Sequence, residues 1–326
     1  MDRPSLAHRT ALGATGVSIP PVCFGTSALG DMPNTYGYGV DPERAHATIK
    51  HVLEGPLPFL DTSRNYGSGR SEARIGEVLR ELGGLPAGAV LSTKLDRDPE
   101  TNRFDAARAR RSLEASLEAL GLDRVQILHL HDPEHAEDVG PIVAPGGALD
   151  ELGKIRDEGL CDAIGLAAGN VEVMRPIVED NAFDVMITHN RFTLVNRNAE
   201  SLIDLARERG VAIMNAAPYA GGVLAKGSAE HPRYVYQEAN DEALEPIRRI
   251  EALCAEHGVA PGAVALQYSM REPRVDATIC GVSRPERVDQ TIAWAGAEVP
   301  AALWEAIREL AVTHEDPEAS RVLGTD

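Results

Sequence analysis

The sequence predicts a closed (β/α)8 barrel with an N-terminal β-hairpin and an extra C-terminal helix. Short apolar runs alternate eight times with longer segments of helical period. Strict alternation of this kind implies parallel strands joined by helical crossovers. The 326 residues lie within the length range of such barrels, and no linker rich in Pro, Gly or Ser divides them. We therefore expect residues 1–326 to form one domain.

The first strand–helix pair shows how the elements are predicted. The run PPVCFGT precedes a helix over residues 41–53, where Asp41 suits the N-cap, Pro42 the first turn and Gly55 the end. The other predicted strands are PFLDT, AVLSTK, RVQILHLH, CDAIGLA, FDVMITHN, VAIMNAA and DATICG. The other predicted helices cover residues 75–82, 104–120, 149–158, 171–178, 199–209, 243–257, 261–270 and 285–295. HRTALGATGVSIP predicts the hairpin before the barrel, and residues 300–312 predict the extra helix.

Composition excludes several classes of partner. The 50 acidic and 32 basic side chains give a formal net charge of −18, which disfavours nucleic acid and anionic membranes. The four cysteines lack CxxC spacing, so neither a disulfide framework nor a zinc knuckle is indicated. MDRPSLAHRT has no apolar run typical of a signal peptide, and no window is apolar enough for a membrane span. We expect a cytoplasmic protein.

Four polar side chains lie at or just beyond predicted strand ends. Asp61, Lys94 and His131 end the second, third and fourth strands, and Tyr66 follows Asp61 by five residues. Active sites of such barrels lie at the carboxyl ends of the strands, so we expect the four to meet there. The Lys94 ammonium is expected to lower the pKa of the Tyr66 phenol, and Asp61 to keep Lys94 charged. His131 is expected to be a neutral donor to a substrate oxygen.

A tyrosine that relays a proton beside a carbonyl suits hydride transfer. The carbonyl oxygen gains negative charge as hydride reaches the carbon, or the alcohol loses a proton in the reverse direction. The four residues therefore imply a nicotinamide cofactor.

The same residues allow three other interpretations. Gly67 and Gly69 invite a dinucleotide-fold interpretation, but the third position of that fingerprint is Glu72. Those glycines more simply permit the turn that returns Tyr66 to the mouth. A Schiff-base role for Lys94 requires a lowered amine pKa, whereas an adjacent Asp61 raises it.

A metal site is the remaining alternative. His129 and His131 share one face of their strand, and His189 is the one further candidate ligand, because the fifth and eighth strand tips carry no His, Asp or Glu. We therefore predict no metal and expect His129 to be a core residue one layer below the mouth.

Five segments together resemble the aldo-keto reductases, in particular the branch of aldose 1-dehydrogenases. They are FLDTSRNYGSGRSEARIGEVL, VLSTKL, VQILHLHDPE, NAAPYAGGVLA and GVSRPERV, and the similarity runs from about residue 10 to residue 292. The resemblance implies a catalytic tetrad of Asp61, Tyr66, Lys94 and His131, with Tyr66 as the acid or base. It also implies NAD or NADP extended across the mouth, and oxidation of the C1 hydroxyl of a free aldose to the lactone. The alternatives are a general NADPH-dependent aldehyde and ketone reductase, and a nicotinamide-binding sensor without activity.

The resemblance also implies a cofactor site on the loops after the seventh and eighth strands, with Arg287 at the adenine and an anion at the helix N-terminus around Pro285 and Glu286. The predicted cofactor residues are Thr26, Asp61, Asn170, His189, Asn190, Pro218, Tyr219, Gly222, Leu224, Gly281, Ser283, Arg284 and Arg287. Gly281 and Val282 replace the Lys-Ser pair common in NADP-specific relatives, which favours NAD even though Arg284 could still serve a 2′-phosphate.

Other positions depart from the family pattern. Ala216 replaces a stacking tyrosine, and Ala167 and Ala168 replace a Ser-Asn pair, so nicotinamide placement does not transfer in full. The predicted substrate residues are Ser27, Tyr36, Asp132 and Phe192. The expected partner is a small sugar or carbonyl compound, and the expected state is a monomer or a small homo-oligomer.

Overall fold

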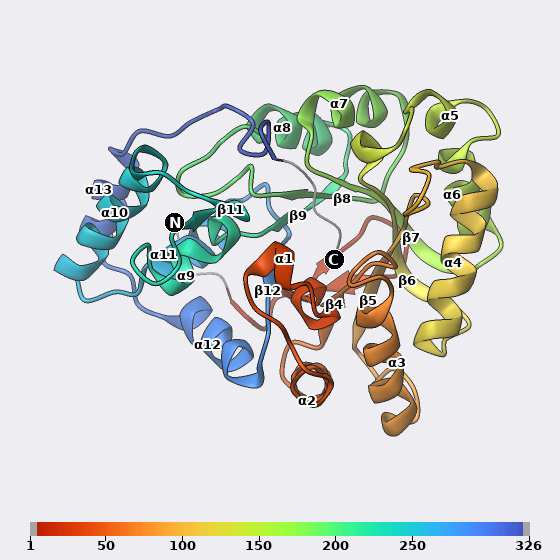
Figure 1. The fold of residues 1–326 in the computed structure, drawn as a ribbon, viewed down its shortest axis with the longest axis horizontal. Coiled ribbons are helices and arrows are strands. Elements are labelled where there is room, and N and C mark those ends of the chain that lie inside the picture. The colour runs from red at the N-terminus through yellow and green to blue at the C-terminus, as the bar shows by residue number, and fades with distance from the viewer. Residues whose placement is uncertain (1–4, 322–326) are drawn as a thin grey trace.

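Eight parallel strands close into a barrel in the computed structural model, which describes residues 5–321 (Figure 1). The strands are β3 (Val22–Gly25), β4 (Phe59–Asp61), β5 (Val90–Leu95), β6 (Val125–His131), β7 (Cys161–Ala168), β8 (Val185–His189), β9 (Ala212–Ala216) and β12 (Ala277–Gly281). Each pairs with the strand before it, and β12 pairs with both β9 and β3 to close the ring. The predicted fold class is confirmed.

Helices surround the strands on the outside of the barrel (Figure 1). The longer ones are α2 (Pro42–Leu53), α3 (Arg70–Leu82), α4 (Ala106–Leu120), α6 (Ala148–Asp157), α7 (Val171–Asp180), α8 (Glu200–Glu208), α10 (Asp241–Glu256), α11 (Pro261–Met270), α12 (Pro285–Gly296) and α13 (Ala301–Arg308). Capping residues determine where several of them begin. Asp41 accepts a hydrogen bond from the Arg44 amide at 2.8 Å, and Asp105 accepts one from the Arg108 amide at 2.8 Å.

The extra helix is shorter than the predicted residues 300–312. After α13 the chain leaves the helical path, because Thr313 forms backbone hydrogen bonds with Val195 and Arg197. The segment that follows, residues 313–321, is called the C-terminal strap below. A second difference lies in the connection after β9, where β10 (Arg233–Tyr234) and β11 (Gln237–Glu238) form a small hairpin that was not predicted.

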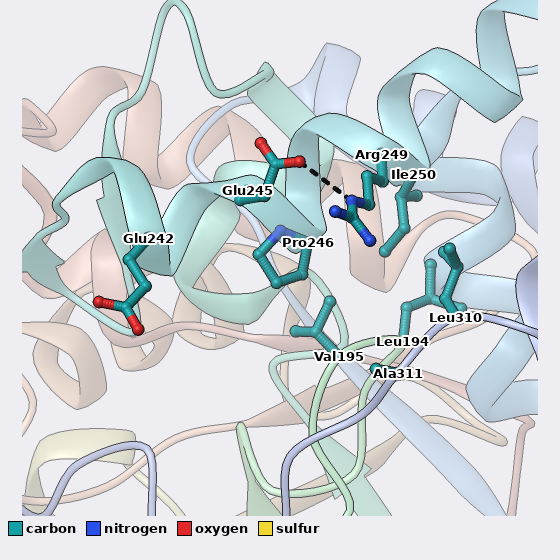
Figure 2. A pocket seen from close by; sticks show the side chains of 9 residues that line it. All are labelled: Leu194, Val195, Glu242, Glu245, Pro246, Arg249, Ile250, Leu310 and Ala311. Atoms are coloured by element: carbon teal, nitrogen blue, oxygen red, sulfur yellow. Dashed lines mark hydrogen bonds and ion pairs between the residues drawn. The ribbon is translucent and has the colours of Figure 1, made fainter.

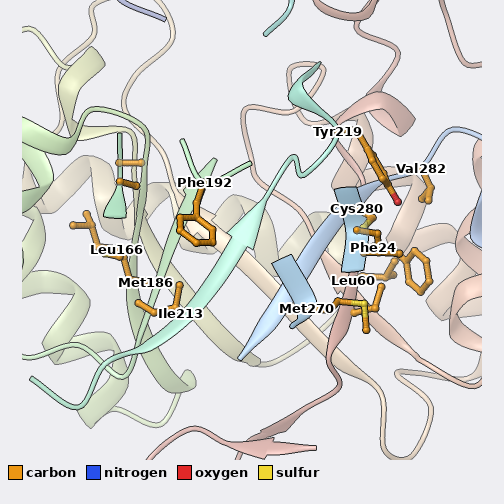
Figure 3. Close-up of a cluster of buried hydrophobic side chains, with 14 of the residues drawn as sticks. Phe24, Leu60, Leu166, Met186, Phe192, Ile213, Tyr219, Met270, Cys280 and Val282 are labelled. Carbon is orange, nitrogen blue, oxygen red and sulfur yellow. The ribbon is translucent and has the colours of Figure 1, made fainter. Parts of the chain in front are cut away.

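Alternation along each strand separates two hydrophobic layers. In β5, Leu91 and Leu95 belong to the large cluster between the sheet and the helices, part of which Figure 3 shows. Val90 belongs to the smaller inner cluster. Since successive side chains point to opposite faces, Ser92 and Lys94 also point into the barrel, closer to its mouth.

The predicted N-terminal hairpin consists of β1 (Thr10–Ala11) and β2 (Ser18–Ile19). Its buried side chains Leu12, Val17 and Ile19 pack with inward residues from the first half of the barrel strands, such as Phe59 and Val90. The hairpin therefore closes the amino end of the barrel with apolar side chains, and the polar inward residues lie at the opposite end.

The remaining elements are short pieces in the connections. They are η1 (Ser27–Gly30), α1 (Pro33–Tyr36), η2 (Pro133–His135), α5 (Gly140–Val143), η3 (Ala220–Gly222) and α9 (Val223–Lys226). Within residues 5–321, no helix combines the length and the apolar character needed to cross a membrane.

Packing of the hairpin predicts a large cost for one truncation. Leu12 is 0% exposed, so Leu12→Ala should lower the free energy of unfolding by about 2–5 kcal/mol through the lost apolar contacts and the cavity. Urea denaturation followed by circular dichroism measures this. Val143→Ala is the control, because Val143 is 42% exposed and its truncation should cost less than about 0.5 kcal/mol. Equal effects of the two substitutions would contradict a sealing role for the hairpin.

Candidate functional site

Tyr66 returns to the barrel mouth through a close backbone contact. Gly67 has a φ of +60°, and a Cβ added there would lie 1.9 Å from the carbonyl oxygen of Gly30. A Cβ on Gly30 would in turn lie 2.8 Å from the carbonyl oxygen of Tyr66. The two glycines let the loop after β4 pack directly on the loop after β3. The turn-forming interpretation of Gly67 fits this contact.

Asp61, Tyr66 and Lys94 form a connected group at the ends of β4 and β5. Lys94 Nζ lies 2.8 Å from Asp61 Oδ2, and the side chains of Lys94 and Asp61 are 2% and 5% exposed. Nζ also donates to the Thr62 carbonyl at 2.5 Å and to Tyr66 Oη at 3.3 Å. Asp61 accepts a further bond from Ser92 Oγ at 3.0 Å. The position of the ammonium is thus held by partners on three sides.

The hydrogen bond between Lys94 and Tyr66 determines where the phenol proton can point. An ammonium carries three hydrogens and no lone pair, so Tyr66 Oη must accept from Nζ. The hydroxyl hydrogen of Tyr66 is therefore left for another acceptor. His131 lies beside the same ring, with ring centroids 5.9 Å apart and an edge-on angle of 82°. All four tetrad residues meet at the mouth, as the sequence predicts.

The expected lowering of the Tyr66 pKa is wrong for this structure. Burial raises the pKa of the phenol well above its usual value, and the negative charges of Asp61, Asp132 and Asp96 add to the rise. The physical reason is that Lys94 is already paired with Asp61, so its charge does not outweigh the loss of hydration. Tyr66 is consequently a neutral phenol that can donate its proton.

His131 also differs from its prediction, because an acidic residue not predicted from the sequence contacts it. Asp96 Oδ1 lies 2.5 Å from His131 Nδ1, and Asp132 Oδ2 lies 3.5 Å from Nε2. Burial alone would lower the pKa of His131, but the Asp132 and Asp96 carboxylates raise it above its usual value. The ring is thus biased towards its charged form rather than the expected neutral one. Asp96 follows Lys94 by two residues, so strand alternation could have indicated it.

The rival interpretations receive no support from the geometry. Glu72 is 0% exposed and accepts a hydrogen bond from Thr93 at 2.7 Å, so it is part of a buried network rather than a phosphate loop. His129 is 0% exposed, and within the described residues neither of its ring nitrogens has a hydrogen-bond partner. It lies in the barrel core, as expected. Across residues 5–321, no group of three His, Cys, Asp or Glu side chains is arranged to hold a metal ion.

Three of the four predicted substrate residues lie beside the tetrad. Asp132 faces His131. Tyr36 is close enough for its charge to influence the pKa of Tyr66, and it is hydrogen-bonded to Ser27. Phe192 lies elsewhere, 0% exposed, with its ring centroid 5.6 Å from that of Tyr268. Its side chain packs in the core (Figure 3). The chain that follows it forms backbone hydrogen bonds with Thr313 through Val195 and Arg197.

Basic side chains cluster on the predicted cofactor side of the mouth, although the net charge of the whole chain is negative. Lys226 Nζ lies 4.4 Å from the ring centroid of Tyr38, whose hydroxyl is bonded to Ser283. Burial lowers the pKa of Lys226, and the charges of Arg287, Arg233 and Arg284 lower it further. A cluster of four positive charges can bind a polyanion such as a pyrophosphate. The residues present therefore fit a dinucleotide.

The helix N-terminus beside these cations needs one correction. Pro285 carries no amide hydrogen, so Glu286 is the first residue of α12 whose backbone N–H could face an anion. Gly281 is exposed at the tip of β12, and Arg284 is exposed at the N-cap of α12.

The loop after β9 contributes less side-chain surface than predicted. Pro218, Tyr219 and Leu224 are buried, and the Tyr219 ring packs edge-on against Trp294 with centroids 5.8 Å apart. Figure 3 shows Tyr219 near Cys280 in the core. Gly222 has a φ of +105° and is partly exposed. Contacts of this loop with a ligand would therefore come mainly from its backbone.

The other predicted cofactor residues are tied into the scaffold. Thr26 is 0% exposed, and its hydroxyl donates to the Asp61 backbone carbonyl at 3.0 Å. It therefore helps to hold the backbone of Asp61 in place. The Asn170 side chain caps α7 by accepting from the amides of Glu172 and Val173.

The C-terminal strap reaches the mouth beside His189 and Asn190. Glu318 Oε2 lies 3.2 Å from His189 Nδ1 and 2.7 Å from Arg191 Nη1. Asn190 is buried and adopts a left-handed backbone conformation with a φ of +59°. Burial would raise the pKa of Glu318, but His189, Arg191 and Arg321 lower it strongly. Nothing in the sequence pattern placed this carboxylate at the mouth.

One hollow on the surface is unrelated to the tetrad. A cavity of about 280 Å³ lies between α10, the loop after β8 and the residues that follow α13 (Figure 2). Its lining residues are Leu194, Val195, Glu242, Glu245, Pro246, Arg249, Ile250, Leu310 and Ala311. None of the tetrad residues lines it.

Comparison with known proteins agrees with this geometry. Residues 21–312 match the Aldo/keto reductase family. The chain is 28% identical to a D-threo-aldose 1-dehydrogenase from Pseudomonas sp over 92% of its own length and 96% of the relative. It is 29% identical to an L-galactose dehydrogenase from Arabidopsis thaliana, with 87% and 86% covered. It is 25% identical to a pyridoxal 4-dehydrogenase from Microbacterium luteolum, with 93% and 97% covered.

The fold is also shared with solved structures. An aldo-keto reductase from Bacillus halodurans superposes with a TM-score of 0.75 at 19% identity, covering 95% of this chain and 99% of that one.

The family match spans most of the residues, including all four members of the tetrad. The chain therefore belongs to the aldo/keto reductase family and is an NAD(P)-dependent oxidoreductase.

Proposed function

We propose that this enzyme oxidises the C1 hydroxyl of a free aldose to the aldonolactone, with NAD as its preferred cofactor. The observation that carries the proposal is the tetrad: Tyr66 Oη accepts from Lys94 Nζ at 3.3 Å and lies beside His131, at a mouth lined by polar groups. Two relatives with nearly full coverage, a D-threo-aldose 1-dehydrogenase and an L-galactose dehydrogenase, act on sugars by name.

Each tetrad residue has a distinct task in this proposal. The nicotinamide ring, when bound, takes up or supplies the hydride. In the oxidation, the Tyr66 phenol first releases its proton to solvent, and the phenolate, stabilised by the Lys94 ammonium, then takes the proton of the C1 hydroxyl. In the reverse reduction the neutral phenol donates its proton to the carbonyl oxygen. Asp61 holds the ammonium in place. His131 Nε2 contacts the same sugar oxygen and orients it.

The preference for NAD is supported by two positions of the strand-β12 loop. Gly281 and Val282 offer no cationic or hydroxyl side chain for a 2′-phosphate. Arg284 is exposed at the N-cap of α12, and its Nε lies 4.0 Å from Glu286 Oε2. Lys226, Arg233 and Arg287 cluster with it, and in this proposal they serve the pyrophosphate that both cofactors share.

A panel of substrates with both cofactors tests the activity. Absorbance at 340 nm should rise with NAD and at least one aldose, because the hydride from C1 reduces the cofactor, and the KM for NAD should be lower than that for NADP. The panel should include D-threo-aldoses, L-galactose and L-fucose, with pyridoxal because one relative is a pyridoxal 4-dehydrogenase. Turnover of simple aldehydes with NADPH, but of no aldose, would instead identify a general carbonyl reductase. Cofactor binding without any turnover would identify a sensor.

Removal of the Tyr66 hydroxyl tests the proton relay. Tyr66→Phe should lower kcat by about 10²–10⁴-fold, the usual worth of a positioned acid or base. The dissociation constant for NAD, measured by fluorescence titration, should change little, since the ring and its packing remain. Tyr38→Phe is a matched control, because it removes a phenol hydroxyl next to Ser283 rather than next to Lys94. A Tyr66→Phe enzyme with most of its kcat would exclude Tyr66 as the relay.

A further inference from the structure

We propose that Asp96 is a positioning residue that holds the His131 ring through Nδ1 and thereby presents Nε2 to the substrate oxygen. The inference rests on the proposed function only in naming that oxygen as the target of Nε2. Asp96 would be the fifth residue of the site. It contacts the Nδ1 side of the His131 ring, whereas the Nε2 side faces the substrate oxygen in this proposal.

The Asp96 carboxylate is fully buried, and both of its oxygens are engaged. Oδ1 lies 2.5 Å from His131 Nδ1. Oδ2 accepts hydrogen bonds from Ser63 Oγ at 2.6 Å and from the Asn65 amide at 3.0 Å. Ser63 Oγ also lies 3.2 Å from His131 Nδ1. Charge and geometry of the carboxylate are therefore fixed by the loop that carries Tyr66.

The backbone of Asp96 is held just as firmly. Its amide donates to Ser112 Oγ at 2.9 Å, and its carbonyl accepts from Arg108 Nε at 2.9 Å. Both partners belong to α4, so the end of β5 is tied to the helix that follows it. A carboxylate held from both sides can fix the orientation of a partner ring without moving itself.

The contact at Nδ1 determines the role of Nε2. An ionised carboxylate only accepts hydrogen bonds, so Nδ1 must carry a hydrogen. Nε2 is then an acceptor when the ring is neutral and a donor when the ring is charged. Burial opposes the ionised form of Asp96, but His131 and the donors Ser63 and Asn65 bring the pKa of Asp96 below its usual value. Asp96 is therefore ionised at neutral pH.

Four other groups face the His131 ring and set its charge. Asp132 Oδ2 lies 3.5 Å from Nε2, and its side chain is 22% exposed. The Lys94 ammonium disfavours the charged ring, as does burial, whereas Asp132 and Asp96 favour it and raise the pKa of His131. Tyr66 is a neutral phenol, and His129 is kept neutral because burial lowers its pKa well below the usual value. The two carboxylates prevail, so the charged ring, with Nε2 as a charge-assisted donor, persists to a higher pH than in a free histidine.

Nuclear magnetic resonance of the imidazole nitrogens tests the inference without any substrate. Protein labelled with ¹⁵N-histidine, with His131 assigned by a His131→Gln variant, is titrated from pH 5 to pH 9. In the wild type, Nδ1 should stay protonated above the titration midpoint. In Asp96→Asn, the proton affinity of the ring should fall about tenfold or more, and the fixed tautomer should be lost. An unchanged midpoint and tautomer in a folded Asp96→Asn protein would overturn the proposal.

Asp132→Asn is the matched control, because it removes the other carboxylate that faces the same ring. It should lower the midpoint but keep the hydrogen on Nδ1, since the Asp96 contact remains. Loss of the Nδ1 tautomer in Asp132→Asn, with retention in Asp96→Asn, would assign the positioning role to Asp132 instead. Asp96→Glu, which keeps the charge, should restore part of the wild-type titration.

Kinetics provides the second readout. Asp96→Asn should lower kcat by about tenfold or more, shift the pH profile by the same amount as the His131 midpoint, and change KM for the cofactor little. In a His131→Gln background the same substitution should cost little further activity. A full additional loss would show that Asp96 acts on the fold and overturn its action through His131. If no aldose is oxidised but the titration shifts as expected, the proposed substrate fails and the positioning role stands.

Discussion

The buried ion pair between Lys94 and Asp61 is the interaction on which the rest of the site depends. Two charges removed from water are costly unless they are paired and their remaining hydrogen-bonding groups are satisfied. Here the ammonium uses its hydrogens on Asp61, the Thr62 carbonyl and Tyr66. That arrangement leaves the phenol hydrogen pointing elsewhere, and it also explains why the ammonium does not acidify the phenol. The same pairing thus orients Tyr66, while burial keeps the phenol neutral.

The barrel could be predicted from the sequence because its signals are local and repeated. Capping residues such as Asp41, helical periodicity such as that of α3, and apolar runs such as β6 each specify an element without reference to the others. Three tetrad residues could be placed because strand ends converge in this fold. Element ends were less predictable where tertiary contacts decide them, as at α13, which stops where Thr313 pairs with the loop at residues 195–197.

The remainder of the site depends on contacts between segments that no local pattern reports. Asp96 was missed because it lies two residues past the predicted strand AVLSTK, although its spacing from Lys94 indicated the same face. The direction of the Tyr66 pKa was mispredicted because the sequence shows which charges are near but not how much water is lost. Phe192 was placed at the mouth because it follows β8, whereas the loop carries its ring into the core.

The wall of the mouth at β8 is completed by residues from the far end of the chain. Glu318 and Asp316 bind Arg191 from the strap, and Glu318 also meets His189. Substitutions in the C-terminal strap can therefore change the shape and charge of this part of the entrance. The strap is not one of the eight hydrogen-bonded strands of the barrel. Such separation lets the shape and charge of the entrance change while Asp61, Tyr66, Lys94 and His131 stay the same.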